Sequence, residues 1–219
     1  VPMIQKKAVL KCNRAAKPVI IATQMMESMI EAPTPTRAEA NDVANAVMDG
    51  ADAVMLSAET AVGSYPLEAI DAVEKILRST EKGWNIYNKA QLPMPDSPTF
   101  FSDEICYTAV TLGNTIKAKA IISMTQTGYT AYKIASCRPN CHVFIFTSNK
   151  QLLTQLSLVW NVKVYLYDKK TNTDDTVKDV ISVLKQHKWI EKDDIVINTA
   201  AMPAMENRKT NTLKITQVR

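Results

Sequence analysis

Two apolar runs separated by an amphipathic helix are the feature that most constrains the fold of this chain. Residues 18–22 and 53–56 are continuous apolar runs, typical of parallel strands buried on both faces. Between them, Thr36 and Glu39 form the T-x-x-E pattern of a capping box, and Gly50 is placed to end the helix. This strand–helix–strand order favours a parallel sheet with right-handed crossovers, so we expect a β/α fold.

A proline-rich stretch predicts a boundary between two domains. Residues 93–98 contain three prolines beside Asp and Ser, which is typical of a linker. We therefore predict one domain over residues 1–92 and a second over residues 99–219. The first has only two predicted strands, which cannot close a barrel or cover both faces of a sheet, so we expect it to be the end of a larger domain.

The second domain is predicted to be a complete α/β domain with a five-stranded mixed sheet. Ser102 is placed to cap its first helix, and Asn149 is placed to cap a later one. The last strand alternates apolar and polar residues, as an edge strand with one wet face does. The predicted strands cover residues 120–124, 143–147, 162–167, 195–198 and 213–216.

The composition argues against several classes of protein. The net charge of +4 is spread along the chain, which disfavours nucleic-acid binding. No apolar run is long enough to span a membrane, and the first residues lack the apolar core of a signal peptide. The cysteines lack the spacing of a zinc site, so we expect reduced thiols, no metal held by this chain and a cytoplasmic location. They are Cys12, Cys106, Cys137 and Cys141.

A series of motifs resembles the pyruvate kinase family over essentially the whole chain. The motifs are TQM at 23–25, PTRAE at 35–39, DVANAV at 42–47, LSAET at 56–60 and TNT at 210–212. The resemblance implies the last two strands of a (β/α)8 TIM barrel, followed by the regulatory C-terminal α/β domain. It also implies phosphoryl transfer from phosphoenolpyruvate to ADP, which gives pyruvate and ATP in the last step of glycolysis.

The same resemblance implies that part of the catalytic machinery lies outside this chain. The family uses Mg²⁺ and K⁺, and its metal ligands and catalytic lysine belong to earlier barrel strands. We therefore expect the 219-residue chain by itself to be inactive. The competing hypothesis is a stand-alone regulatory α/β module that binds a phosphometabolite effector and does no chemistry.

The residues that follow the two predicted strands are the first candidates for a site, because barrel active sites lie at the carboxyl ends of strands. The resemblance implies that Thr23, with Gln24, contacts the substrate. A hydroxyl there can position water or relay a proton to the enolate; Ser57 is the second candidate for this relay. The alternative is that each hydroxyl only bonds nearby backbone. Glu59 either supports this site or bonds the next helix N-terminus, and Ala58 replaces the family's usual glycine.

Two charged residues on the helix after the TQM motif are candidates for a subunit interface. The resemblance places Arg37 and Asp42 near a neighbouring subunit of a homo-oligomer, a homotetramer in the family. The alternative is a solvated set of charges on one helix face.

A second candidate site lies between a strand and a helix in the C-terminal domain. Backbone N–H groups at a helix N-terminus can bind phosphate, and hydroxyls flank them here. The resemblance implies that the matching loop binds the phosphate of a sugar-phosphate effector. The alternative is ordinary N-capping. The candidate residues are Thr125, Thr127, Gly128 and Thr130.

Overall fold

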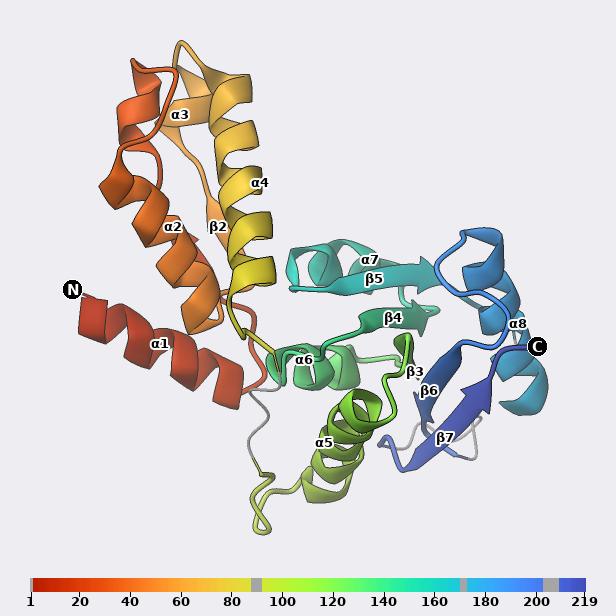
Figure 1. Ribbon diagram of the computed structural model, residues 1–219. Helices are drawn as coiled ribbons and strands as arrows, with labels where there is room; N and C mark the ends of the chain where they lie inside the picture. The colour runs from red at the N-terminus through yellow and green to blue at the C-terminus, as the bar shows by residue number, and fades with distance from the viewer. Residues whose placement is uncertain (1, 88–91, 170–172, 203–208) are drawn as a thin grey trace. The chain divides into compact units, whose positions relative to one another are not determined.

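The computed structural model describes residues 2–87, 92–169, 173–202 and 209–219 of the chain. The chain divides into two compact units, Val1–Ile86 and Tyr87–Arg219 (Figure 1). We call them the N-terminal unit and the C-terminal unit, and each is described by itself.

The N-terminal unit is built on a two-stranded parallel sheet. Its strands pair with Ile20 opposite Ala53 and Ala22 opposite Met55. Helices α2 and α4 cover the sheet through a core that includes Met26, Met29 and Val43. The elements in chain order are α1 (Pro2–Arg14), β1 (Ile20–Ala22), the 3-10 helix η1 (Glu27–Ile30), α2 (Arg37–Asp49), β2 (Ala53–Met55), α3 (Ala58–Ala61) and α4 (Pro66–Gly83).

The ends of α2 follow from local sequence signals. The Thr36 hydroxyl accepts the N–H of Glu39 at 3.3 Å, and the Glu39 carboxylate accepts the N–H of Thr36 at 2.8 Å. Gly50 ends the helix in the left-handed conformation, with φ 97°. The predicted capping box and the predicted glycine terminus are therefore both confirmed.

The two strands of the N-terminal unit are buried on one face only. Ile20 and Met55 each expose 44% of their surface, whereas Ile21 and Val54 pack against the core. Successive side chains of a strand point to opposite faces, and α2 and α4 cover one of them. The prediction that these strands are buried on both faces is therefore wrong for the described chain.

The C-terminal unit contains a five-stranded mixed sheet, as predicted. The strand order is β5-β4-β3-β6-β7, and β7 alone runs antiparallel to its neighbour. The elements are α5 (Phe100–Thr115), β3 (Ala120–Met124), α6 (Tyr129–Ser136), β4 (His142–Thr147), α7 (Lys150–Gln155), the 3-10 helix η2 (Leu156–Leu158), β5 (Val162–Leu166), α8 (Thr173–Gln186), β6 (Ile195–Ala200) and β7 (Thr212–Gln217).

Helices cover both faces of this sheet. Ile121 and Ile145 point into the core formed with α5, α6 and α7, while Phe144 and Phe146 point into the core formed with α8. Each face thus has its own fully buried cluster, as expected of a doubly wound domain.

One of the two predicted helix caps in the C-terminal unit is confirmed. Asn149 caps α7 by accepting the N–H of Gln151 at 3.0 Å. The prediction for Ser102 is wrong, because α5 begins at Phe100 and buries Ser102 in its first turn. Its hydroxyl donates to the carbonyl of Thr210 at 2.9 Å, a partner 108 residues away. A long-range hydrogen bond has replaced the local one.

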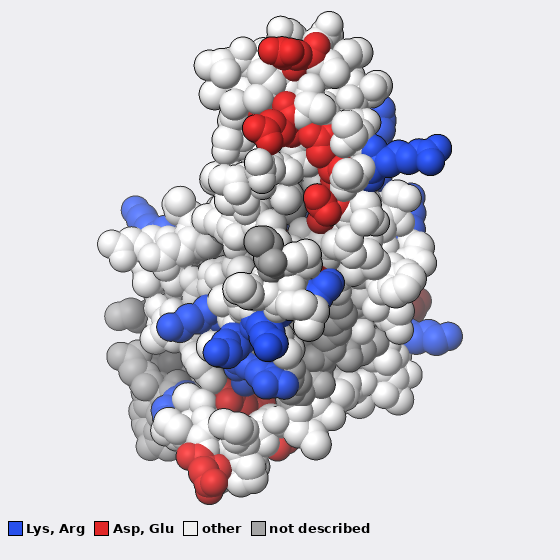
Figure 2. Space-filling view, turned by 90° about the vertical axis from the view of Figure 1, so that its left-hand side faces the viewer, with Lys and Arg blue, Asp and Glu red and all other residues white. Residues whose placement is uncertain are grey.

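The surface carries charges of both signs. On the face drawn in Figure 2, several Lys and Arg side chains lie close together while others lie apart, and acidic side chains lie in separate patches. In the described ranges, every helix is too short or too polar to cross a lipid bilayer.

Candidate functional site at the carboxyl ends of two strands

Two loops leave the same edge of the N-terminal sheet. One begins at Thr23, directly after β1, and the other passes through Ser57, directly before α3. Because Ala22 pairs with Met55 in a parallel register, the loops are neighbours at the carboxyl ends of the strands. The structure therefore brings together Thr23, Gln24 and Ser57, the three candidates for substrate contact and proton relay.

The loop after β1 begins with two strained residues. Thr23 has φ 69° and Gln24 has φ 54°, both in the left-handed region. Such conformations cost about 1–3 kcal/mol each, and they are rare for a β-branched residue such as threonine. Both side chains are exposed, and the Thr23 hydroxyl donates to the carbonyl of Ala22 at 2.6 Å. Strain of this kind concentrates at functional sites.

The loop after β2 presents an exposed hydroxyl. Ser57 precedes α3, and in this described loop its side chain makes no capping hydrogen bond. Ala58, the first residue of α3, is not among the described residues with positive φ. The replacement of the family's usual glycine by Ala58 therefore does not strain the backbone. A Cβ on Gly63 would lie 2.5 Å from the carbonyl oxygen of Glu59, so this tight turn requires glycine there.

A buried carboxylate joins the two loops. Glu59 exposes 3% of its surface and accepts the N–H of Ser57 at 2.6 Å and the N–H of Met26 at 3.2 Å. Burial alone raises the pKa of Glu59, but hydrogen bonds from the backbone N–H groups of Ser57, Glu59 and Met26 outweigh it and hold the pKa below its ordinary value. Glu59 is therefore ionised at neutral pH. The sequence left the role of Glu59 open, because its partner Met26 lies 33 positions away and no local pattern links the two residues.

A second carboxylate fixes the next part of the same loop. Glu39 accepts the N–H of Ser28 at 2.7 Å and its hydroxyl at 2.5 Å, in addition to the N–H of Thr36. Burial raises the pKa of Glu39, but the hydrogen bonds from Ser28 and Thr36 prevail and lower it to about 2. The segment between β1 and α2 is thus held at both ends by carboxylates.

The two interface candidates lie on the surface of α2. Arg37 is the first residue of the helix, and Asp42 follows five residues later. Both side chains are exposed and thus accessible to solvent or to a partner.

The candidate phosphate loop lies in the C-terminal unit, between β3 and α6. The Thr125 hydroxyl accepts the N–H of Gly128 at 3.0 Å, and the Thr127 hydroxyl accepts the N–H of Tyr129 at 3.4 Å. The hydroxyls of Thr130 and Thr210 lie 2.7 Å apart. These contacts organise the loop from within, and Thr127 is the exposed threonine among the three candidates.

A buried acid anchors the helix that follows this loop, and sequence reasoning missed it. Asp103, 4% exposed, accepts the Tyr129 hydroxyl at 2.5 Å and lies 3.3 Å from the Lys133 ammonium. Burial and the hydrogen bond to Asp103 raise the pKa of Tyr129 to about 12. No local pattern signals this contact, because Asp103 and Tyr129 are 26 positions apart.

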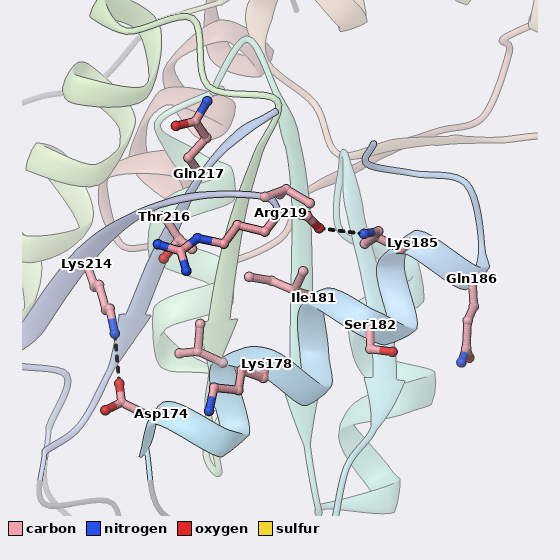
Figure 3. Close-up of a pocket in the computed structure, with 12 residues that line it drawn as sticks. Asp174, Lys178, Ile181, Ser182, Lys185, Gln186, Lys214, Thr216, Gln217 and Arg219 are labelled. Atoms are coloured by element: carbon pink, nitrogen blue, oxygen red, sulfur yellow. Dashed lines mark hydrogen bonds and ion pairs between the residues drawn. The ribbon is translucent and has the colours of Figure 1, made fainter. Parts of the chain in front are cut away.

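A basic groove of about 720 Å³ lies between α8 and β7 in the C-terminal unit (Figure 3). Its three lysines have partners within the chain. Lys214 lies 2.8 Å from Asp174, and Lys185 donates to the carbonyl of Arg219 at 2.7 Å. Lys178 contacts Asp175 at 3.3 Å. The groove therefore contains ion pairs and a hydrogen bond to a backbone carbonyl beside the apolar side chains of Val177, Ile181 and Val218.

His, Cys, Asp and Glu side chains are the usual protein ligands of metal ions, and they occur throughout the described ranges. Within them, no group of three or more His, Cys, Asp or Glu side chains could hold one. Burial raises the pKa of the Cys106, Cys137 and Cys141 thiols, which makes them poor nucleophiles and poor ligands. These residues do not fit a metal site.

The fold and the site define a class: an α/β protein with strained loops at the carboxyl edge of a parallel sheet and a separate doubly wound domain. Comparisons with known proteins refine this class. Residues 1–70 match the family model for the pyruvate kinase barrel domain, and residues 103–216 match that for the pyruvate kinase alpha/beta domain. The chain belongs to the pyruvate kinase family.

Individual relatives support this assignment. Pyruvate kinase from Sporosarcina psychrophila is 39% identical over 215 residues, which cover 98% of this chain and 37% of that relative. Pyruvate kinase from Clostridium acetobutylicum is 38% identical, covering 98% of this chain and 46% of that relative. A crystal structure of a pyruvate kinase from Cryptosporidium parvum superimposes with a TM-score of 0.86 at 33% identity, covering 98% of this chain and 43% of that one. The chain thus spans less than half the length of these relatives.

Proposed function

We propose that this chain supplies two loops of a pyruvate kinase active site. In this reaction the phosphoryl group leaves the enol oxygen of phosphoenolpyruvate and bonds to a terminal phosphate oxygen of ADP, giving ATP and the enolate of pyruvate. The observation that carries the proposal is the strained, exposed Thr23–Gln24 pair beside Ser57, inside the segment that matches the barrel domain.

In this proposal Thr23 and Gln24 contact the substrate. The enolate carbon must gain a proton to become the methyl group of pyruvate, and the donor must lie close to that carbon. The exposed Thr23 hydroxyl is the first candidate to position the donor water or to relay the proton, and the Ser57 hydroxyl is the second. Both hydroxyls lie at the carboxyl edge where barrel enzymes place their chemistry.

Mg²⁺ and K⁺ belong to the proposal only as cofactors of the whole enzyme. Their ligands and the catalytic lysine are assigned to segments outside this chain, and no step above runs through a metal ion. We therefore expect the chain assayed alone to be inactive. The proposal also includes a cytoplasmic location and a homo-oligomer, a homotetramer by analogy with the family. Exposed Arg37 and Asp42 are proposed at its subunit contact.

The Thr125–Thr130 loop is proposed to bind the phosphate of an effector. The support is its position at the N-terminus of α6 and the exposure of Thr127. Titration calorimetry with a panel of sugar phosphates tests this role. Binding that a Thr127→Ala change abolishes supports it, and an absence of binding assigns the loop to helix capping.

A chimera tests the proposed activity. Residues 1–219 replace the matching part of the Clostridium acetobutylicum enzyme. The assay measures the pyruvate that is released when the phosphoryl group passes from phosphoenolpyruvate to ADP. We expect the chimera to be active and Thr23→Val to lower kcat by about 10²-fold, the scale of one proton-transfer group. Thr80→Val is the matched control, because the Thr80 hydroxyl also donates to a backbone carbonyl, that of Ile76 at 2.8 Å.

The outcomes separate the two hypotheses for this chain. An inactive chimera that is folded contradicts the proposed activity and leaves the stand-alone regulatory module as the hypothesis to pursue. The regulatory-module hypothesis is not favoured, because residues 1–70 match a barrel domain and a module that only binds an effector does not require barrel strands.

A further inference from the structure

The Glu59 carboxylate makes a contact that ordinary helix capping does not explain. A carboxylate in the first turn of a short helix needs only the N–H groups of its own turn. One oxygen of Glu59 accepts the N–H of Ser57, as such a cap would. The other oxygen reaches across to the N–H of Met26, which belongs to the loop after the neighbouring strand. Glu59 therefore bridges the two loops that carry the candidate site.

Because of the position of Met26, the hydrogen bonds of Glu59 fix the backbone beside the strained residues. Met26 is fully buried and follows the strained pair Thr23–Gln24 by two residues. Residues held in a left-handed conformation persist only where their surroundings fix them. The buried Met26 side chain and its N–H bond to Glu59 fix the chain just after the pair. On the other loop, the same carboxylate fixes the N–H of Ser57.

We propose that Glu59 is a positioning residue that holds Thr23, Gln24 and Ser57 in register across the two loops. The inference rests on the proposed function and deepens it, because it assigns a role to a side chain that acts through others. Both carboxylate oxygens accept N–H groups, so an amide of the same shape cannot replace it: its NH₂ group would face one of the two donors.

Glu59→Gln tests the inference, and Glu39→Gln is its matched control. Both carboxylates accept backbone N–H groups from two separate segments, and each has a lowered pKa. The donors to Glu39 are Ser28 and Thr36, which lie farther along the segment after β1 than Met26 and outside the Ser57 loop. A loss of stability alone should therefore be similar in the two variants.

The first measurement is amide hydrogen exchange in the 219-residue chain, which requires no activity. We expect Glu59→Gln to speed exchange at Met26 and Ser57 by at least about tenfold, the loss of one hydrogen bond of about 1.4 kcal/mol, while Glu39→Gln leaves both unchanged. Unchanged exchange at Met26 in Glu59→Gln would overturn the inference.

The second measurement is steady-state kinetics in the chimera described above. We expect Glu59→Gln to lower kcat about tenfold or more with KM within about twofold, because misplaced groups affect the transition state more than ground-state binding. Glu39→Gln should keep kcat. If the unmodified chimera is active and Glu59→Gln and Glu39→Gln have equal kcat, the inference is overturned. An inactive unmodified chimera counts against the proposed function, and the exchange result then decides the inference alone.

Discussion

The two units of this chain both alternate strands and helices, but they bury their strands to very different extents. In the C-terminal unit, Val143, Phe144 and Ile145 of β4 are all fully buried, because β4 has a hydrogen-bonded neighbour on each side and helices on both faces. In the N-terminal unit, Ile20 of β1 is 44% exposed, because its sheet has two strands and one covered face. The same kind of apolar run thus stabilises the two units unequally.

The units also differ in how polar groups anchor their loops. The N-terminal unit uses Glu39 and Glu59, carboxylates in which hydrogen-bond donors outweigh burial and lower the pKa. The C-terminal unit uses Asp103, which accepts the Tyr129 hydroxyl; burial, together with this hydrogen bond, raises the pKa of Tyr129 to about 12. One unit is therefore expected to be more sensitive to acid and the other to alkali. Three pairs of substitutions, one of each pair in each unit, test these differences.

The largest difference is expected from one substitution made in both sheets. Ile145→Ala should lower the free energy of unfolding by about 2–5 kcal/mol, because it leaves a cavity in a fully buried core. Ile20→Ala should cost about 1 kcal/mol or less, because the side chain is already half exposed. Hydrogen exchange of the amides in each unit measures both values. Equal losses would mean that β1 is buried in solution.

A smaller difference in the free energy of unfolding is expected when each of two glycines is replaced by alanine, and the two changes should have opposite signs. Gly128→Ala should destabilise the C-terminal unit by about 1–2 kcal/mol, because φ is +80° and the new Cβ would lie 3.0 Å from Leu152. At Gly83, at the end of α4, a Cβ meets no described atom within 4 Å, so Gly83→Ala should stabilise by up to about 1 kcal/mol. Urea unfolding of each variant gives the values. A neutral Gly128→Ala would contradict the left-handed conformation.

The smallest effects are expected in the dependence of stability on pH. The folded pKa of Glu39 is about 2 against an ordinary 4.5, so its contribution is present above pH 4.5 and is lost as pH falls toward 2. The folded pKa of Tyr129 is about 12 against 10, so its contribution is present below pH 10 and is lost as pH rises toward 12.

Removing each group should flatten one side of the stability profile. Glu39→Gln should reduce the fall in Tm between pH 5 and pH 3 by about 4 °C, and Tyr129→Phe should reduce the fall above pH 10 by a similar amount. Calorimetry across pH measures both. A single variant that flattens both sides would show that the two anchors are not independent.

Local signals in the sequence predicted much of this architecture because their physics is local. The Thr36–Glu39 capping box and the terminal Gly50 use donors and acceptors within one turn of α2, and both are confirmed. The parallel order of strands and helices follows from apolar runs and connection lengths. The prediction for Ser102 was wrong because a capping preference competes with any partner the fold provides, and Thr210 is that partner.

The candidate site was only partly predictable for a similar reason. Thr23 and Ser57 could be placed at strand ends from the sequence, because residues that follow parallel strands share one edge of the sheet. The left-handed conformations of Thr23 and Gln24 could not, since threonine has no intrinsic preference for them. Asp103 gave no signal, because a buried acid is recognised by its partners rather than by its neighbours in sequence.

The order of elements, the ends of α2 and the family could be predicted from the sequence, because apolar periodicity, capping residues and motifs are properties of short segments. Which faces are buried, which backbone positions are strained and which carboxylate joins the two loops depend instead on contacts between segments that are distant in the sequence. Glu59 shows why: its two hydrogen bonds go to residues 2 and 33 positions away, and only the folding of β1 beside β2 brings those donors to one carboxylate.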